Sequence, residues 1–526
     1  MKNKLMSKIV ESGVWLQPGI MTFIVRYIRE NNLNSLNSYK DWIYCFILSL
    51  LPILILNSGK SSKSNAKTAW TGKESAMYPA LPSNILYKNP QGVVLGRDIK
   101  TSKYVCKCLK EDGHVFVIGG SGSGKSSCLV IPTLVSNPKT TVFAIDIKGE
   151  LSFKSTRYGN DKVLIFNPAD RYKCGYDPLY RLSEDCRDQE ILEVMQDISF
   201  SLIPMPASIK DPFWKNSARN LLTGLMIFYY KQGFIDFIDI IDQILSKPVT
   251  ESIQEVCKQS SNKTPEYRYI VQFSQMAEET LGGIVGEMNN HIVIFSNDQD
   301  IRYAFKDNGN KANPHKLEEG YSIYLSIREE KLSAYYDVIQ LIINQVLGEL
   351  ERRAEGSPPI IVCIDELPRL LSSGKMEHLL DGARTLRSRN VCLFLVTQST
   401  EALMSAFTEN EVADLISNCS YIVVLSATSS KTQKSVCSWC GKYMVKKRSW
   451  SNTGKGSKSS IAYDEKDIVS PSDLMTLKNT GEAIIITPYG YGRVKKTPWY
   501  KDKTMRKKVE EVIKYNKAIK DMEESI

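Results

Sequence analysis

The sequence lacks the cysteine pattern of a disulfide-stabilised secreted domain. Its 12 cysteines are scattered along 526 residues with no regular spacing. Most lie in apolar runs, where cysteine behaves as a small hydrophobic residue. The pattern therefore favours a reducing compartment. Spacing alone does not establish a four-ligand zinc site from the only close pairs, which are Cys106 with Cys108 and Cys437 with Cys440.

Internal repeats are also absent, and the excess of basic residues is small. The 68 Lys and Arg against 58 Asp and Glu give a net charge of +10. That value permits contact with nucleic acid or an anionic membrane without requiring either. A hydrophobic content of 42% excludes a disordered chain, and the length allows two to four compact units.

Only one apolar run is long enough to suggest a clear membrane segment. Trp42–Leu56 extends for 15 residues without a charge. A helix of that length spans about 22 Å, whereas the hydrocarbon core of a bilayer is about 30 Å thick. The segment must therefore recruit flanking residues, thin the bilayer or pair with a neighbour such as Val14–Ile28. A buried core helix and an uncleaved signal segment are the alternatives.

Basic residues on both sides of this region predict its orientation. By the positive-inside rule both ends lie in the cytoplasm, and the polar stretch Glu30–Asp41 lies outside. We therefore predict a protein of the inner (plasma) membrane with a cytoplasmic catalytic domain. The flanking residues are Lys2, Lys4, Lys8, Lys60, Lys63, Lys67 and Lys73.

After a polar linker, Ser58–Lys73, short β-like runs alternate with helical patterns. This alternation predicts an α/β fold with a parallel sheet covered by helices on both faces. Between residues 181 and 295, apolar spacings of three and four predict an inserted all-α domain instead. The predicted division is 1–60, membrane anchor; 61–180, nucleotide-binding domain, first part with linker; 181–295, all-α domain; 296–499, nucleotide-binding domain, second part; and 500–526, charged tail.

The strands are expected at eight positions. They are His114–Ile118, Thr141–Ile147, Val163–Phe166, Tyr321–Ile327, Ile360–Ile364, Val391–Val396, Tyr421–Leu425 and Glu482–Ile486.

Residues 119–126 read GGSGSGKS and match the phosphate-loop pattern G-x-x-x-x-G-K-[ST] between a strand and a helix. Its glycines let backbone N–H groups turn toward phosphate oxygens. Lys125 supplies positive charge to the β- and γ-phosphates, and Ser126 offers a hydroxyl to Mg²⁺. The predicted ATP-binding residues are Gly119, Gly120, Ser121, Gly122, Ser123, Gly124, Lys125, Ser126 and Ser127.

Another apolar strand ends in Asp365 and Glu366, in the form of a Walker B motif. We expect Asp365 to orient Mg²⁺ and Glu366 to polarise the attacking water, which a hydrolase needs. Acidic residues at strand ends are also common helix N-caps. A further strand ends in Gln398, whose amide is able to sense the γ-phosphate.

A basic cluster, ARTLRSR at 383–389, precedes the strand that ends in Gln398. It is either a solvated helix end or the source of an arginine for the phosphate of a neighbouring subunit.

Several further sequence motifs follow one another along the chain between residues 129 and 483. They are LVIPTL at 129–134, DIKGEL at 146–151, FNP at 166–168, YDPL at 176–179, DPFW at 211–214, DELPRL at 365–370, TQS at 397–399, NC at 418–419, PSDL at 471–474 and GEA at 481–483. Together they resemble the TraG/TraD family, the coupling proteins of type IV secretion and conjugation. The resemblance covers roughly residues 90–490.

The resemblance implies a membrane-anchored, homohexameric, RecA-like P-loop NTPase that uses ATP and Mg²⁺. Its substrates would be single-stranded DNA with a relaxase or relaxosome proteins, or other proteins, and its partner the type IV secretion channel. The all-α domain would recognise the substrate. Arg387 matches a basic position of the family and would act in trans, with Arg384 and Arg389 as competing candidates. Family members often carry two clear spans with a small domain between them, and this chain departs from that pattern.

Two alternatives remain at this stage. A chromosome-partitioning translocase of the FtsK kind would share the motor and the hexamer, but should carry a winged-helix domain after it. The stretch beyond Trp499 is too short for one and is expected to be a solvated helix. A membrane adaptor that uses nucleotide only for assembly is the other alternative, and Glu366 argues against it.

Overall fold

The computed structural model describes residues 78–524, with gaps at 112, 161, 171–173, 184, 207–208, 307–308, 310, 372–374 and 454–455. The predicted membrane segment Trp42–Leu56 and the linker Ser58–Lys73 lie outside the described residues. Among the described residues, no helix combines the length and the apolar character needed to cross a bilayer.

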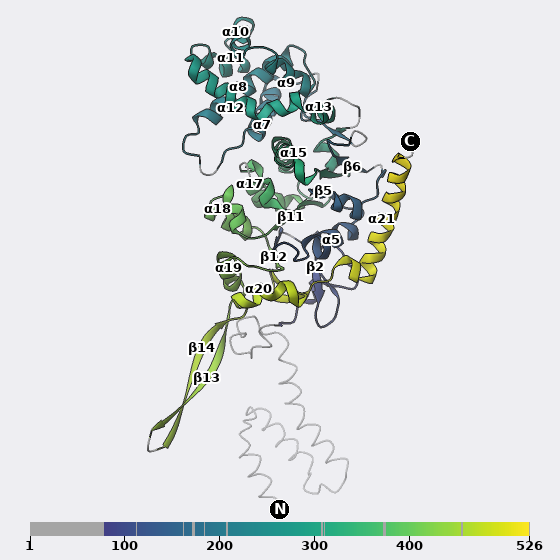
Figure 1. Cartoon of the computed structure of the whole chain (residues 1–526), viewed down its shortest axis with the longest axis vertical. Helices are drawn as coiled ribbons and strands as arrows, with labels where there is room; N and C mark the ends of the chain where they lie inside the picture. Colours follow the sequence, from purple (N-terminus) through teal and green to yellow (C-terminus); the bar gives the residue numbers. More distant parts are fainter. Residues whose placement is uncertain are drawn as a thin grey trace, which may run out of the picture. The chain divides into compact units, whose positions relative to one another are not determined.

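The main sheet of the described chain has 12 strands in the order β1-β3-β2-β16-β15-β12-β4-β11-β10-β5-β9-β6 (Figure 1). The strands from β12 to β6 pair in parallel. Their bounds are β12 Tyr421–Val424, β4 Val115–Ile118, β11 Val391–Thr397, β10 Ile360–Ile364, β5 Thr141–Asp146, β9 Ser322–Ser326 and β6 Val163–Phe166.

The other end of the sheet is antiparallel, which corrects the prediction for the strand near residue 482. This strand, β15, was expected in the parallel sheet but runs against β12. The strands beyond it also pair antiparallel. Their bounds are β15 Glu482–Thr487, β16 Gly490–Lys495, β2 Val93–Asp98, β3 Tyr104–Lys107 and β1 Leu86–Tyr87.

Every residue of β4, β10 and β11 is buried. Burial on both faces explains why these strands are continuous apolar runs. Side chains of β4 alternate between two cores, because successive residues of a strand point to opposite faces. Phe116 and Ile118 lie in the first core, and Val115 and Val117 lie in the second.

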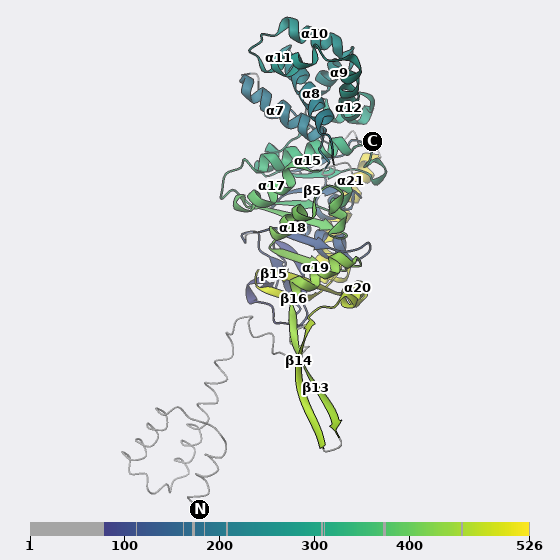
Figure 2. The same cartoon turned by 90° about the vertical axis from the view of Figure 1, so that its left-hand side faces the viewer.

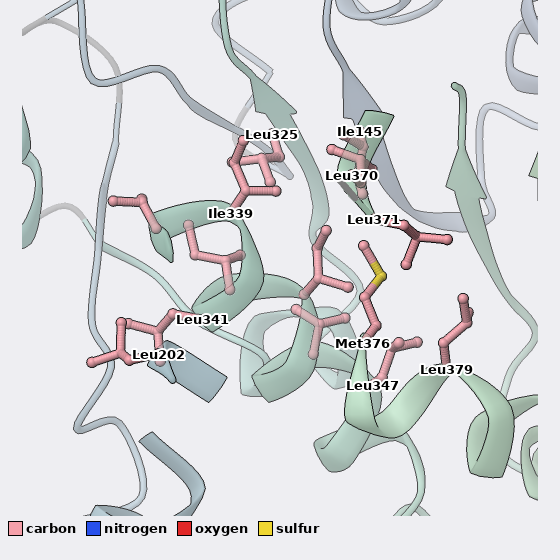
Figure 3. Packing of buried hydrophobic residues seen from close by; sticks show 14 of the residues in the cluster. Ile145, Leu202, Leu325, Ile339, Leu341, Leu347, Leu370, Leu371, Met376 and Leu379 are labelled. Carbon is pink, nitrogen blue, oxygen red and sulfur yellow. The ribbon is translucent and has the colours of Figure 1, made fainter. Parts of the chain in front are cut away.

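Helices α15, α17 and α18 cover one face of the sheet, and α5 and α21 cover the other, with α6 against both α5 and α21 (Figures 1 and 2). Figure 3 shows part of the first core, which contains Ile339 and Leu347 of α15 together with Ile145, Leu325 and Met376. The helices outside the 188–305 segment are α5 Ile131–Ser136, α6 Glu150–Ser155, α14 His315–Glu318, α15 Tyr336–Leu350, α16 Leu367–Leu370, α17 Glu377–Thr385, α18 Glu409–Ser417, α19 Ser430–Cys440, α20 Pro471–Thr480 and α21 Lys503–Glu524.

A block of α-helices interrupts the sheet between residues 188 and 305. A short parallel pair, β7 Gly175–Tyr176 with β8 Lys311–Ala312, brings the chain entering the block beside the chain leaving it. The helices are α7 Asp188–Leu202, α8 Phe213–Lys231, α9 Phe237–Leu245, α10 Val249–Gln259, α11 Pro265–Ile270, α12 Glu278–Asn297 and α13 Gln299–Phe305.

Two features differ from the sequence expectations. A long hairpin of β13 Lys442–Thr453 and β14 Gly456–Asp467 was not predicted. The tail was expected to be solvated, but one face of α21 is buried and includes Met505 and Val509. The solvated prediction was therefore wrong for that face, where apolar residues at helical spacing pack against the sheet domain.

Candidate active site

The phosphate loop follows β4 and leads into a π-helical turn, Lys125–Val130, that continues as α5. Gly122 and Gly124 have left-handed φ angles of 69° and 97°. A Cβ on Gly124 would lie 2.8 Å from the sulfur of Cys128, and one on Gly119 would lie 2.5 Å from Ser123 Oγ. Gly122 and Gly124 are therefore favoured by their backbone conformation, Gly119 by the lack of space for a side chain, and Gly124 for both reasons.

Two hydrogen bonds from backbone N–H groups fix the start of the loop to neighbouring strands. Gly119 N–H donates to Thr397 O at 3.0 Å, at the end of β11. Gly120 N–H donates to Ser426 Oγ at 3.0 Å, just after β12. The loop thus begins in a fixed position at the carboxyl edge of the sheet.

Lys478 contacts the middle of the loop, where its ammonium donates to Ser121 O at 2.9 Å. Ser127 lies on the first turn of the helix, with its hydroxyl 3.8 Å from the Cys128 sulfur. Sequence reasoning missed Ser426 and Lys478, because neither belongs to a pattern and both approach the loop only in the folded chain.

The Lys125 side chain folds back on the loop and is almost fully buried. Its ammonium donates to Gly119 O at 2.9 Å and lies 3.8 Å from Glu366 Oε1. The predicted phosphate-binding lysine and the predicted water-activating glutamate are therefore neighbours. An ammonium has three N–H donors, so Lys125 keeps capacity for a further acceptor.

Ser126 and Asp365 are brought together as predicted. Ser126 Oγ donates to Asp365 Oδ2 at 2.9 Å. The other carboxyl oxygen, Oδ1, is buried and has no hydrogen-bond partner among the described residues. Burial raises the pKa of the Asp365 carboxyl, and the Ser126 hydrogen bond offsets this only in part. An orphaned carboxyl oxygen beside a hydroxyl is an oxygen-ligand environment that suits Mg²⁺.

Glu366 has a left-handed φ of 62°, which is uncommon for a residue with a side chain. Its Oε2 accepts from Gln398 Nε2 at 3.1 Å and lies 3.7 Å from Arg369 Nε. The strained backbone turns the carboxylate toward the loop, where it lies between Lys125 and Gln398. Such strain occurs at functional sites that the surrounding fold stabilises.

Asp146, at the end of β5, forms part of the same site and was not assigned a role from sequence. Its buried carboxylate accepts from the N–H and the hydroxyl of Ser152, at 2.8 and 2.9 Å. Burial raises its pKa, against these hydrogen bonds. The signal available in the sequence was an apolar strand ending in an acid, the same pattern as at Asp365. A small pocket lies between these elements and is lined by Ser126, Asp146, Ile147, Lys148, Glu150, Leu151, Asp365 and Glu366.

A family model for type IV secretory system conjugative DNA transfer matches residues 81–522. The chain belongs to this family. The resemblance drawn from the motifs is confirmed, and so is the role in conjugative DNA transfer that it implied. No curated protein matches the chain.

Solved structures of the plasmid coupling protein TrwB share the fold. The unbound monoclinic form of the bacterial protein TrwBdeltaN70 has 16% identity and a TM-score of 0.62 over 81% of this chain and 91% of that one. The complex of TrwB with the non-hydrolysable ATP analogue ADPNP has 16% identity and a TM-score of 0.62, covering 80% and 96%. The complex with ADP and Mg²⁺ has 16% identity and a TM-score of 0.55, covering 73% and 85%.

The arginine cluster of this family member lies at the opposite edge of the sheet from the phosphate loop. Arg387 is in a 3-10 turn, Leu386–Arg389, just before β11 begins, whereas the loop contacts the end of β11. The seven residues of β11 correspond to about 20 Å. The structure therefore does not bring Arg387 to the loop of its own chain.

The two competing arginines make contacts within the chain. Arg384 pairs with Asp414 at 2.6 Å and with Asp381 at 3.1 Å. Arg389 donates to the Arg353 carbonyl. Arg387 is exposed, as Arg384 is, and its match to a basic position of the family stays a prediction.

Replacement of Gly124 by alanine tests the shape of the loop, and Gly233 provides a matched control. Both have nearly the same φ, 97° and 96°, but a Cβ on Gly233 meets nothing within 4 Å. Each variant should lose about 1–2 kcal/mol of stability through left-handed strain. Only Gly124→Ala should also weaken binding of an ATP analogue, by about tenfold, which corresponds to about 1.4 kcal/mol of loop displacement. Titration and thermal unfolding of both variants provide the measurement, and equal binding by the two would contradict this account of the loop.

Proposed function

We propose that the chain is the ATP-hydrolysing motor of a conjugative type IV secretion system and couples DNA or protein substrates to the channel. The observation that carries this proposal is the convergence of Ser126, Asp365 and Glu366 on one small pocket, with the Lys125 ammonium 3.8 Å from Glu366 Oε1. Family membership gives the biological context. The residues present suit both a nucleoside triphosphate and a divalent cation.

The phosphate loop would bind the nucleotide through its backbone N–H groups and the Lys125 ammonium. Ser126 and Asp365 would hold Mg²⁺, which would neutralise charge that develops on the phosphates. Lys125 would then exchange its hydrogen bond to Gly119 O for one to a phosphate oxygen. The strained glycines allow the loop backbone to approach the phosphates closely.

Glu366 would orient and polarise the attacking water. Its carboxylate is positioned by Gln398 at 3.1 Å, and Gln398 follows the last residue of β11. Loss of the γ-phosphate would change the acceptors available to Gln398 and Glu366 together. The pair is therefore suited to transmit hydrolysis to β11 and the segments that follow it.

The arrangement of Arg387 favours a ring in which each subunit completes the site of its neighbour. An arginine about 20 Å from its own loop is able to reach a phosphate only on another copy of the chain. We propose a homohexamer in which Arg387 stabilises charge that develops on the γ-phosphate in the transition state. The helical block from α7 to α13 would recognise single-stranded DNA, a relaxase or another relaxosome protein.

Substitution of Glu366 by glutamine separates binding from hydrolysis. The amide keeps the shape of the side chain but cannot act as a base, so ATP binding should persist while turnover falls about 10²- to 10⁴-fold. Glu330→Gln is the control, because Glu330 is an exposed carboxylate outside this pocket. Phosphate release and analogue binding are the measurements. Unchanged turnover in Glu366→Gln would assign the base to another acid, with Asp146 the first candidate. No turnover in the wild type would favour a membrane adaptor that uses nucleotide only for assembly.

Mixed hexamers test whether Arg387 acts in trans. Arg387→Ala and Lys125→Ala subunits should each be inactive alone, and turnover should recover in part on mixing. Recovery is expected because some interfaces then join an intact Lys125 to an intact Arg387. A mixture of Lys125→Ala with Glu366→Gln is the control, since the two residues are neighbours in the site of one subunit and no complete site forms. Absence of recovery in mixtures shown to form joint rings would exclude action in trans.

Fractionation of cells tests the proposed membrane anchor within residues 1–60. The full-length protein should sediment with the inner membrane, and removal of these residues should release it to the soluble fraction. Ring formation and turnover should weaken in the released protein, because confinement to a membrane raises the effective subunit concentration. Full-length protein found in the soluble fraction would refute the anchor.

A further inference from the structure

Asn516, on the C-terminal helix α21, makes a set of hydrogen bonds that the helix itself does not require. Its side chain is fully buried, although Tyr515 and Lys517 beside it are exposed. The amide oxygen accepts from Tyr158 N–H at 2.8 Å. The amide nitrogen donates to Phe153 O and to Thr156 O, both at 2.8 Å. The amide oxygen and both N–H groups of Asn516 are therefore bonded to one short segment.

That segment is the end of α6, Glu150–Ser155, with Thr156 as its C-cap residue. The last carbonyl groups of a helix have no partner within the helix. Asn516 provides such partners from a position 360 residues away in sequence. It therefore caps α6 from outside.

The other end of α6 forms a wall of the candidate active site. Asp146 accepts from the Ser152 N–H and hydroxyl, and the pocket that contains Ser126 and Asp365 is also lined by Glu150 and Leu151. A helix of six residues is about 9 Å long and too short to be stable alone. Its position must therefore depend on contacts from outside the helix, and these include Asp146 near its start and Asn516 at its end.

Helix α21, which carries Asn516, is itself anchored to the sheet domain. Asp502, just before α21, accepts from Arg97 Nε at 2.9 Å and from the Tyr104 hydroxyl at 2.9 Å. Met505 and Val509 of α21 are buried in the second core. Asn516 therefore caps α6 from a helix that is packed against the sheet domain.

We propose that Asn516 is a positioning residue for ATP hydrolysis. By holding the far end of α6, it keeps Asp146 and the first turn of α6 in the place where they face Ser126 and Asp365. This inference rests on the proposed ATPase function. Loss of the cap should lower turnover more than nucleotide affinity, because Lys125 is held by Gly119 and Glu366, which are not part of α6. A small misplacement of active-site groups costs about 10- to 100-fold in rate.

The experiment compares Asn516→Ala and Asn516→Asp with two controls in the full-length protein. Aspartate keeps the acceptor for Tyr158 N–H but loses the donor to the two carbonyls. Val509→Ala is the control for stability, because it removes buried contacts of α21 without touching the cap. Lys517→Ala is the exposed neighbour on the same helix. Amide hydrogen exchange of residues 150–158, steady-state turnover over a range of ATP concentrations and melting temperature are measured for each.

We expect Asn516→Ala to speed exchange in residues 150–158 by about tenfold, as loss of a helix cap does. Turnover should fall about 10- to 100-fold with KM nearly unchanged. Asn516→Asp should behave in the same direction, whereas Val509→Ala should change neither quantity beyond its general loss of stability. Lys517→Ala should match the wild type.

Two outcomes would overturn the inference. Exchange in residues 150–158 that is no faster in Asn516→Ala than in Val509→Ala would show that the cap does not hold α6. Faster exchange with unchanged turnover would show that α6 is capped but does not position the site. Lys125→Ala, measured in parallel, keeps the two proposals apart. Wild-type turnover in that variant refutes the active site itself, whereas an inactive Lys125→Ala beside a fully active Asn516→Ala refutes only the positioning role.

Discussion

Parallel pairing of β4, β11 and β10 is the constraint on which the candidate active site depends. Parallel strands end at the same edge of a sheet, so residues that follow them are brought together whatever their distance in sequence. Ser126 and Asp365 meet in this way across 239 positions. The bond from Gly119 N–H to Thr397 O extends the same pairing by one residue into the phosphate loop. A slip in the β4–β11 register would separate all of these groups.

The site contains features that the rest of the fold has to stabilise. The left-handed backbone of Glu366 costs about 1–2 kcal/mol, and the buried Asp365 carboxyl group has one oxygen without a hydrogen-bond partner among the described residues. Both follow β10, whose residues are all buried and which pairs with β11 on one side and β5 on the other. Leu367, the next residue, is also buried and begins α16. Asp365 and Glu366 thus lie between a buried strand and a buried first residue of α16. Packing of the large sheet offsets the free-energy cost of the strained backbone and of the unsatisfied oxygen.

The strands that carry the site were the most predictable elements. Burial on both faces leaves a continuous apolar run, and the observed bounds of β4, β10 and β11 lie within one residue of those expected. The direction of β15 was not predictable, because it depends on a pairing with β12 that local sequence does not encode. Asn516 shows a second limit. One polar residue in a charged stretch looks solvated until its partners, 360 residues away, are known.

The stiffness of the sheet also limits what one copy of the chain can do alone. Glu366 and Gln398 lie at the carboxyl edge of the strands, and Arg387 lies at the amino edge, about 20 Å away along β11. A close-packed sheet does not shorten to bring these edges together. In the proposed ring, each subunit would therefore present its carboxyl edge to one neighbour and its amino edge to the other. The same strand, β11, would then connect two successive nucleotide sites, so that a shift caused by hydrolysis at one interface is carried through a rigid element to the next.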